Sequence, residues 1–192
     1  MTGNVSRKEV RIITGAVHAG KSTELYRLIE EYMDRGMSVD GVVTEAEIEG
    51  GRKNAFYLRR VLGAGSGGRV GDVCSGEKVL LAWRVENGAD TGGSRRLRTP
   101  GFVFDGEGFA RARRWIASAV KRGVDVICID ELGPVELRGE GHWPSVEHVL
   151  DEFDGTFLAV VRQELSSAFA AKFRERGRKV LFHEVPGRRK ER

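Results

Sequence analysis

The chain has 192 residues, of which 40% are apolar and 31% are charged. This is the length of one compact domain, and the composition argues against a mainly disordered chain. The longest stretch without an acidic or basic residue, from Ile12 to Gly20, is far shorter than the roughly 18 to 20 apolar residues of a membrane-spanning helix. The polar N-terminus also lacks the apolar core of a secretory signal, so we expect a cytoplasmic protein with no membrane partner.

The formal net charge is +4, and the basic tail at residues 187–192 supplies +3 of it. The rest of the chain is close to neutral, which argues against a nucleic-acid-binding surface. Cys74 and Cys128 are too few for a disulfide framework and form no zinc-binding pair. Cys128 lies in an apolar run, which predicts a buried thiol.

The first elements predict a β-α-β unit. Val10 to Thr14 is a β-branched run typical of a strand, and Gly15 opens a loop after it. Apolar residues then recur at helical spacing from Lys21 to Tyr32, with Gly36 as the C-cap. Val39 to Thr44 reads as the next strand, and a right-handed crossover makes parallel pairing of the two strands the expectation.

Residues 45–100 differ in character, with clustered glycines and two short apolar runs, Phe56 to Leu62 and Val79 to Trp83. This pattern predicts a β-rich insertion of hairpins and loops. Its second part, Arg84 to Pro100, contains Arg95, Arg96 and Arg98 after a run with three glycines, and it predicts a mobile loop.

Regular alternation of strands and helices resumes after residue 100. The predicted elements are strand Phe102 to Phe104, helix Gly106 to Arg122, strand Val124 to Asp130, helix Pro144 to Phe153, strand Thr156 to Val161, helix Ser166 to Arg176 and strand Lys179 to Val185. We therefore expect residues 1–192 to form a single α/β domain, a three-layer sandwich in which helices flank a mostly parallel sheet.

The sharpest motif lies between the first strand and the first helix. It consists of Gly15, Ala16, Val17, His18, Ala19, Gly20, Lys21, Ser22 and Thr23. These residues fit the phosphate loop (Walker A) pattern Gly-x-x-x-x-Gly-Lys-[Ser/Thr] at every fixed position. Glycines let successive backbone N–H groups turn toward a phosphate, and the helix N-terminus favours an anion. The motif predicts a nucleotide-binding site.

Each polar residue of this loop has an expected role. Lys21 would place its positive charge between the β- and γ-phosphates, and the Ser22 hydroxyl would be a ligand of the cofactor Mg²⁺. Thr23 could bond the α-phosphate. His18 occupies a variable position, whose side chain we expect to point away from the phosphates.

A second motif (Walker B) ends the buried strand that begins at Val126. Its last residues are Asp130 and Glu131, at the strand tips where a parallel sheet binds its ligands. Asp130 would hold a magnesium-bound water and so join Ser22 in the metal shell. Glu131, which points in a different direction, could act as the general base toward the attacking water.

Several activities share these motifs. Asp130 to Gly133 also fits the Asp-x-x-Gly of GTPases, yet the chain lacks the Asn-Lys-x-Asp or Thr-Lys-x-Asp element that reads guanine. A kinase for a nucleotide, nucleoside or polynucleotide stays open, because the Arg95 to Arg98 loop could imitate an arginine-rich lid. A nucleotide-switched binding module stays open as well. The adjacent Asp-Glu pair favours hydrolysis.

The chain resembles a known family at this point. Gly15 to Thr23, Thr44-Glu45 followed by Gly50 to Lys53 and Phe56, and above all the run from Ile129 to Leu137 are similar to the THEP-type nucleoside-triphosphatases. The resemblance extends from about Val10 to Val185. It implies a RecA-like P-loop fold and slow, Mg²⁺-dependent hydrolysis of ATP, GTP, CTP, UTP and other nucleoside triphosphates, with broad base tolerance. We take a monomer as the expected form.

Other polar residues have weaker assignments. Arg162, at the end of a strand, could sense the γ-phosphate or lie on the surface. Arg52 and Lys53 could face the nucleotide. His142 and Trp143 could stack on a base, although Trp143 before Pro144 could equally anchor a helix start. We expect His148 and His183 to be structural.

Overall fold

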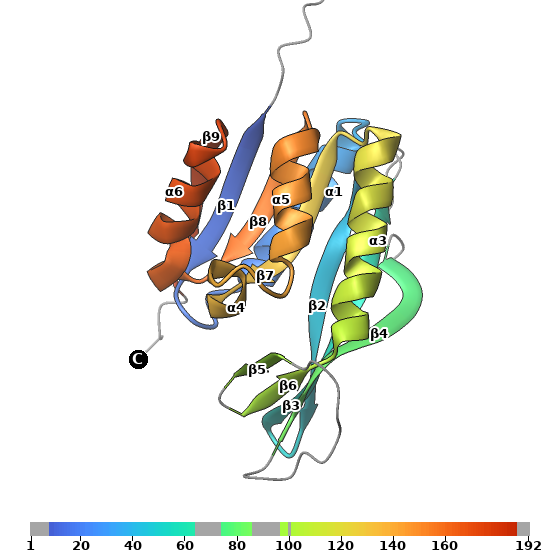
Figure 1. Cartoon of the computed structure of the whole chain (residues 1–192), viewed down its shortest axis with the longest axis vertical. Coiled ribbons are helices and arrows are strands. Elements are labelled where there is room, and N and C mark those ends of the chain that lie inside the picture. The colour runs from blue at the N-terminus through green and yellow to red at the C-terminus, as the bar shows by residue number, and fades with distance from the viewer. Residues whose placement is uncertain (1–7, 64–73, 86–96, 100, 188–192) are drawn as a thin grey trace, which may run out of the picture.

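The computed structural model describes residues 8–63, 74–85, 97–99 and 101–187 (Figure 1). The strands are β1 (Glu9–Gly15), β2 (Val39–Glu49), β3 (Arg52–Gly63), β4 (Cys74–Arg84), β5 (Leu97–Thr99), β6 (Phe102–Phe104), β7 (Val126–Leu132), β8 (Thr156–Val161) and β9 (Lys179–Val185). The helices are α1 (Lys21–Asp34), α3 (Gly106–Arg122), α4 (Pro134–Leu137), α5 (Trp143–Glu152), the 3₁₀ turn η1 (Gln163–Leu165) and α6 (Ser166–Glu175). Among these described helices, none is long and apolar enough to cross a membrane.

All nine described strands form one sheet in the order β5-β6-β4-β3-β2-β7-β8-β1-β9. From β2 to β9 the neighbouring strands pair in parallel, whereas β3, β4, β6 and β5 add antiparallel beyond β2. The chain therefore has a mixed α/β fold with a large sheet, whose parallel part is continued by an antiparallel part. Figure 1 shows the antiparallel strands projecting beyond the ends of the parallel ones.

The expected pairing of the first two strands is wrong. β1 and β2 run in the same direction, but β7 and β8 lie between them in the sheet. The connection through α1 therefore crosses over two strands. In this order the end of β7, with Asp130 and Glu131, has β2 on one side and β8, followed by β1 with its loop, on the other.

The predicted insertion starts inside a strand. β2 continues past Thr44 to Glu49, and a turn at Gly50 and Gly51, both with positive φ (55° and 75°), leads into β3. The two short apolar runs are parts of the longer strands β3 and β4. In the predicted 84–100 loop, residues 86–96 and 100 lie outside the described residues, and Leu97–Thr99 form β5.

The inner parallel strands β1, β7 and β8 are largely buried on both faces, whereas the edge strand β9 is partly exposed. Ile12 and Ile127 point into one apolar cluster, which also contains side chains of α3, α5 and α6. Ile13 and Cys128, the next residues along their strands, point into a second cluster that contains the buried face of α1. Helices thus cover both faces of the sheet (Figure 1), and Cys128 is the buried thiol that the sequence predicts.

Gly41 allows β2 to approach β7 closely. Its φ is +154°, and a Cβ atom added there would lie 2.1 Å from the backbone oxygen of Cys128. Only a residue without a side chain fits at this point. The close approach holds Thr44, three residues further along β2, beside the end of β7.

Candidate active site

The loop after β1 has the backbone that a phosphate loop requires. Gly15 packs against β9, because an added Cβ would lie 2.6 Å from the Val185 backbone oxygen. His18 and Gly20 both have positive φ, 63° and 92°, so the chain reverses just before α1 begins at Lys21. The first N–H groups of α1 therefore face the concave side of this loop, where an anion is favoured.

Lys21 and Ser22 lie at the start of α1. The Lys21 Nζ donates to the backbone oxygens of Gly15 (3.1 Å) and Ala16 (2.9 Å), so its charge lies within the loop. The Ser22 hydroxyl donates to Oδ1 of Asp130 at 3.4 Å. This contact joins the two predicted motifs, which are 108 residues apart in the sequence.

Asp130 is a buried carboxylate at the end of β7. It is 2% exposed, and its Oδ2 accepts the backbone N–H of Thr44 at 3.4 Å. The Thr44 hydroxyl donates to the backbone oxygen of Asp130 at 3.3 Å. Burial raises the pKa of Asp130 to about 7, and the adjacent negative charge of Glu131 contributes to the rise. A positive charge placed beside this carboxylate would stabilise its ionised form.

Glu131 points to the other side of the strand and toward solvent. Its φ of 69° is in the left-handed region, and the β7–β8 register shifts between Ile129 and Leu132. This irregularity leaves the Glu131 side chain 42% exposed, and its Oε1 accepts from Nη2 of Arg162 at 3.1 Å. A non-glycine residue with positive φ is uncommon, and such strain is concentrated at functional sites.

The donors present suit the Mg²⁺ ion that the sequence implies. Ser22 and Asp130 offer hydroxyl and carboxylate oxygens 3.4 Å apart. Mg²⁺ prefers oxygen ligands, retains several waters and is usually bound by one or two protein groups together with substrate phosphates. The described residues contain no cluster of three or more His, Cys, Asp or Glu that could hold a metal ion. A site of this kind would therefore depend on the nucleotide for further ligands.

Glu136 organises the segment after β7. It is 5% exposed, and its carboxylate accepts the backbone N–H groups of Gly133 (2.8 Å) and His142 (3.1 Å). Burial raises its pKa, while the two N–H donors oppose the rise. Glu136 thus connects the segment after Glu131 to the start of α5. This contact explains structurally why a glutamate follows Gly133, Pro134 and Val135 in the motif.

Several residues with weaker assignments lie elsewhere. Arg52 and Lys53 are exposed at the far tip of the β2–β3 hairpin, beyond Thr44. Trp143 begins α5 and is 7% exposed, as a helix-start anchor would be. His183 contacts Oε1 of Glu24 at 2.6 Å.

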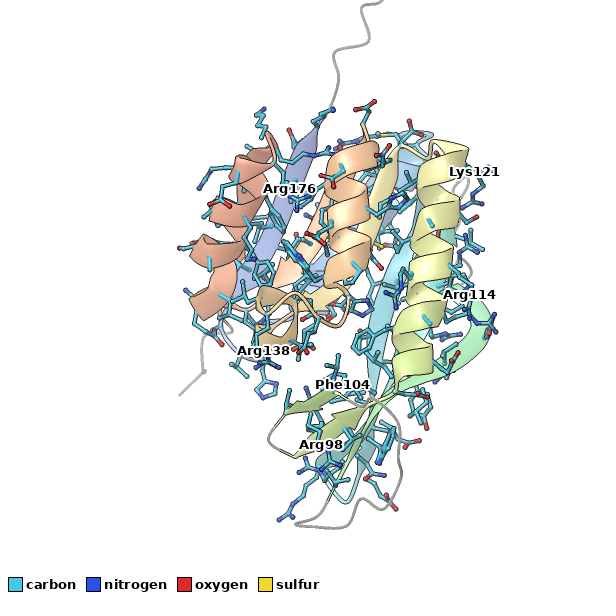
Figure 2. The ribbon with its side chains drawn as sticks, in the orientation of Figure 1. Arg98, Phe104, Arg114, Lys121, Arg138 and Arg176 are labelled. Atoms are coloured by element: carbon cyan, nitrogen blue, oxygen red, sulfur yellow. The ribbon has the colours of Figure 1, made fainter. Side chains whose placement is uncertain are left out.

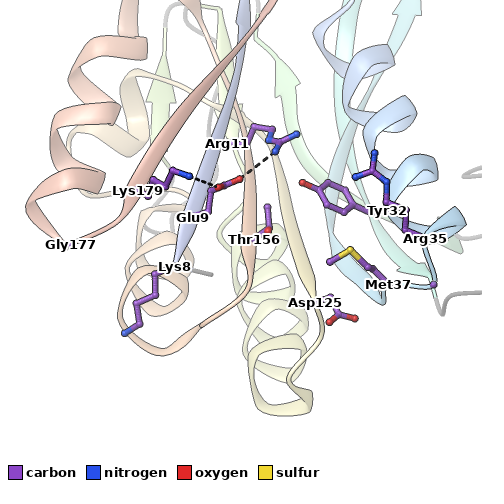
Figure 3. A pocket seen from close by; sticks show the side chains of 11 residues that line it. Lys8, Glu9, Arg11, Tyr32, Arg35, Met37, Asp125, Thr156, Gly177 and Lys179 are labelled. Carbon is purple, nitrogen blue, oxygen red and sulfur yellow. Dashed lines mark hydrogen bonds and ion pairs between the residues drawn. The ribbon is translucent and has the colours of Figure 1, made fainter. Parts of the chain in front are cut away.

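A hollow lies at the end of the parallel strands that is opposite the candidate site (Figure 3). Its volume is about 960 Å³, and it is lined by charged residues around the start of β1. Glu9 bridges Arg11 (3.3 Å) and Lys179 (3.5 Å) there. The phosphate loop follows the other end of β1, so this hollow is remote from the candidate site.

The sequence predicted no separate role for Thr44 and Glu136, and for His142 only the possibility of stacking on a base. Thr44 supports Asp130 by two hydrogen bonds, Glu136 holds the segment after β7, and His142 is buried inside a pocket described below. A glutamate three residues after a Gly-Pro pair could have indicated the capping contact of Glu136. The contacts of Thr44 and His142 depend on strand order and have no local signal.

Comparison with known proteins gives consistent matches. A family model described as NTPase matches residues 11–191. The chain is 28% identical over 181 residues to the nucleoside-triphosphatase THEP1 of Thermofilum pendens, covering 89% of this chain and 84% of that protein. It is 31% identical over 156 residues to the protein of the same name from Methanothermobacter thermautotrophicus, covering 81% and 78%.

A solved structure shares the fold. It is that of a human cancer-related nucleoside triphosphatase, with a TM-score of 0.63 and 22% sequence identity. The superposition covers 92% of this chain and 88% of that chain.

Proposed function

The chain belongs to the nucleoside-triphosphatase family of which the model matches residues 11–191, and we propose that it hydrolyses nucleoside triphosphates to diphosphates and phosphate at the loop after β1. The relatives named above are nucleoside-triphosphatases, which confirms the resemblance found in the sequence. We further propose that the reaction depends on Mg²⁺ and tolerates different bases.

One observation supports this function most directly. Two adjacent carboxylates at the end of β7 have opposite environments, since Asp130 is 2% exposed and bonded to Ser22 whereas the Glu131 side chain is 42% exposed. A carboxylate that helps to hold a metal ion and another that meets water are what phosphoanhydride hydrolysis requires.

The residues then have separate roles in the reaction. Ser22 and Asp130 would hold Mg²⁺, which neutralises charge on the phosphate oxygens when bound. The Lys21 ammonium and the loop N–H groups stabilise the charge that develops as the bond to the leaving diphosphate breaks. Glu131 orients a water in line with that bond and accepts its proton as the new P–O bond forms.

The tolerance for different bases follows from what the sequence lacks. No Asn-Lys-x-Asp or Thr-Lys-x-Asp element is present to read guanine. All the contacts proposed above are directed at phosphates, which ATP, GTP, CTP and UTP share. We therefore expect the four triphosphates to be hydrolysed at similar rates.

The test is phosphate release from each of the four triphosphates, with and without Mg²⁺. Lys21→Ala removes the positive charge from the loop and is expected to abolish binding or turnover. Glu131→Gln is expected to bind nucleotide and lose hydrolysis, whereas Glu164→Gln, an exposed glutamate on η1, keeps the wild-type rate. Full turnover of Glu131→Gln would remove Glu131 as the base.

A kinase activity is tested in the same assay. Phosphate release that continues undiminished when nucleosides are added supports hydrolysis, because water is then the acceptor. Phosphate transferred to the added nucleoside at the expense of release would instead identify a kinase.

A further inference from the structure

A second pocket adjoins the candidate active site. It has a volume of about 480 Å³, and its lining includes Thr44, Glu131 and Arg162 at the ends of β2, β7 and β8. None of the phosphate-loop residues, all of which the structure describes, lines it. Its size lies in the range of small-molecule sites. The pocket is therefore placed to receive a molecule next to the predicted general base.

The walls of this pocket are mainly aromatic. Phe56, Phe102, Phe104 and Phe109 line it from β3, β6 and α3. The rings of Phe104 and Phe109 are stacked with centroids 5.7 Å apart, and those of Phe56 and Phe102 are 5.0 Å apart. All but Phe109 are partly exposed. Such walls suit a flat ring, which can lie against aromatic faces.

His142 supplies an unpaired polar group in the same wall. It is 2% exposed, its ring meets Phe109 edge to face with the centroids 4.9 Å apart, and neither ring nitrogen has a hydrogen-bond partner among the described residues. Burial and the nearby charge of Arg113 lower its pKa to about 4, so near neutral pH the ring offers one donor and one acceptor. An unpaired buried polar group costs free energy, which a ligand that bonds to it would recover.

Three arginines also line the pocket. Arg98, Arg138 and Arg162 line the pocket together with the acidic Glu131 and Glu136. Figure 2 shows Arg98 and Phe104 on the antiparallel strands and Arg138 on the facing side, beside α4. Arg138 is exposed and forms an ion pair with Glu140 at 3.5 Å. Guanidinium groups that line a pocket favour a phosphate or carboxylate.

The pocket is separate from the phosphate loop. In the proposed function the phosphates of the hydrolysed nucleotide lie on residues 15–23, and none of these residues lines the pocket. This separation favours a second molecule as the occupant of the pocket.

We propose that this pocket binds a second small molecule with a flat heteroaromatic ring and a phosphate group, of the size of a nucleoside monophosphate, beside a triphosphate on the phosphate loop. The ring lies against the phenylalanines and bonds to His142, and the phosphate faces the arginines. The site goes beyond the proposed hydrolysis, and its test does not require any turnover.

The test is equilibrium dialysis of labelled AMP, GMP, CMP and UMP against the full chain. Lys21→Ala separates the two sites, because it removes the phosphate-loop charge and leaves the pocket intact. His142→Phe keeps a ring against Phe109 but removes both nitrogens, and His148→Phe on α5 is its matched control. If His142→Phe does not fold, Phe104→Ala is used in its place. Phe182→Ala, at an exposed phenylalanine outside the pocket, is then the control.

The expected result is binding of at least one monophosphate to both wild type and Lys21→Ala. We expect His142→Phe to weaken it about tenfold, as the loss of one buried hydrogen bond does. Loss of binding in Lys21→Ala would place the monophosphate on the phosphate loop and overturn the proposal. Equal binding to His142→Phe, or no binding of any monophosphate up to about 1 mM, would overturn it too. Binding without phosphate release would refute hydrolysis and leave this site standing.

Discussion

His142 should make the stability of the protein depend on pH. In the folded chain, burial and the charge of Arg113 lower its pKa from 6.5 to about 4. In the unfolded chain the ring is in water and binds a proton near its ordinary pKa. Between these two values the unfolded state therefore holds more protons than the folded state. The stability that this histidine contributes is complete above about pH 6.5 and is lost as the pH falls toward 4.

The size of the effect follows from the pKa difference. Each unit of pKa difference corresponds to about 1.4 kcal/mol. The shift from 6.5 to about 4 thus predicts a loss of about 3 kcal/mol of unfolding free energy at about pH 4 relative to about pH 7. Glu136, whose carboxylate accepts the His142 backbone N–H, has a raised pKa and acts in the opposite direction. Its contribution cancels when wild type is compared with a His142 variant.

The assay is unfolding by guanidinium chloride at several pH values for wild type and His142→Phe. We expect the unfolding free energy of wild type to fall by about 3 kcal/mol relative to that of His142→Phe as the pH falls over the whole range. His148→Phe, the same replacement elsewhere on α5, controls for the change of side chain. Parallel curves for wild type and His142→Phe would refute the reasoning, because they would mean that His142 takes up protons equally in both states.

Three further substitutions test the fold and the site. Gly41→Ala places a Cβ atom 2.1 Å from the Cys128 backbone oxygen and should lower the free energy of unfolding by about 3 kcal/mol, seen as a lower melting temperature. Asp40 is fully buried and bonded to Arg60 and Arg122. Asp40→Asn removes the charge that pairs with these arginines and should lower the free energy of chemical unfolding by about 2 kcal/mol. The loss is moderate because both arginines are partly exposed to solvent. Arg162→Gln removes the partner of Glu131 and should lower kcat about tenfold with KM little changed. An unchanged kcat would show that Arg162 has no part in the reaction.

The phosphate loop was predictable because its chemistry is local. Gly15 to Thr23 are contiguous, and the strand before them and the helix after them have clear apolar periods. The end of β7 was visible for the same reason, since a buried run stops at two carboxylates. Most element boundaries agree with the predicted ones within a few residues, and β8 and β9 agree at both ends. The family resemblance rests on these same segments.

Strand order was not predictable from local patterns. The periodicity of Val10 to Thr14 and Val39 to Thr44 shows that both are strands, but it does not show that β7 and β8 lie between them. The position of Arg52 and Lys53 was not predictable for the same reason. They follow a predicted strand closely in sequence, but that strand continues to Glu49, and its extra length moves them to the hairpin tip.

The length of β2 connects the two proposals. Near its middle, Thr44 bonds to Asp130 and so helps to fix the end of β7. Beyond Thr44 the same strand pairs with β3, which carries Phe56 into the wall of the second pocket. A strand ending at Thr44 would leave the carboxylates in place and remove that wall. The antiparallel extension therefore adds the aromatic wall that makes a pocket beside Glu131 at the end of the parallel strands.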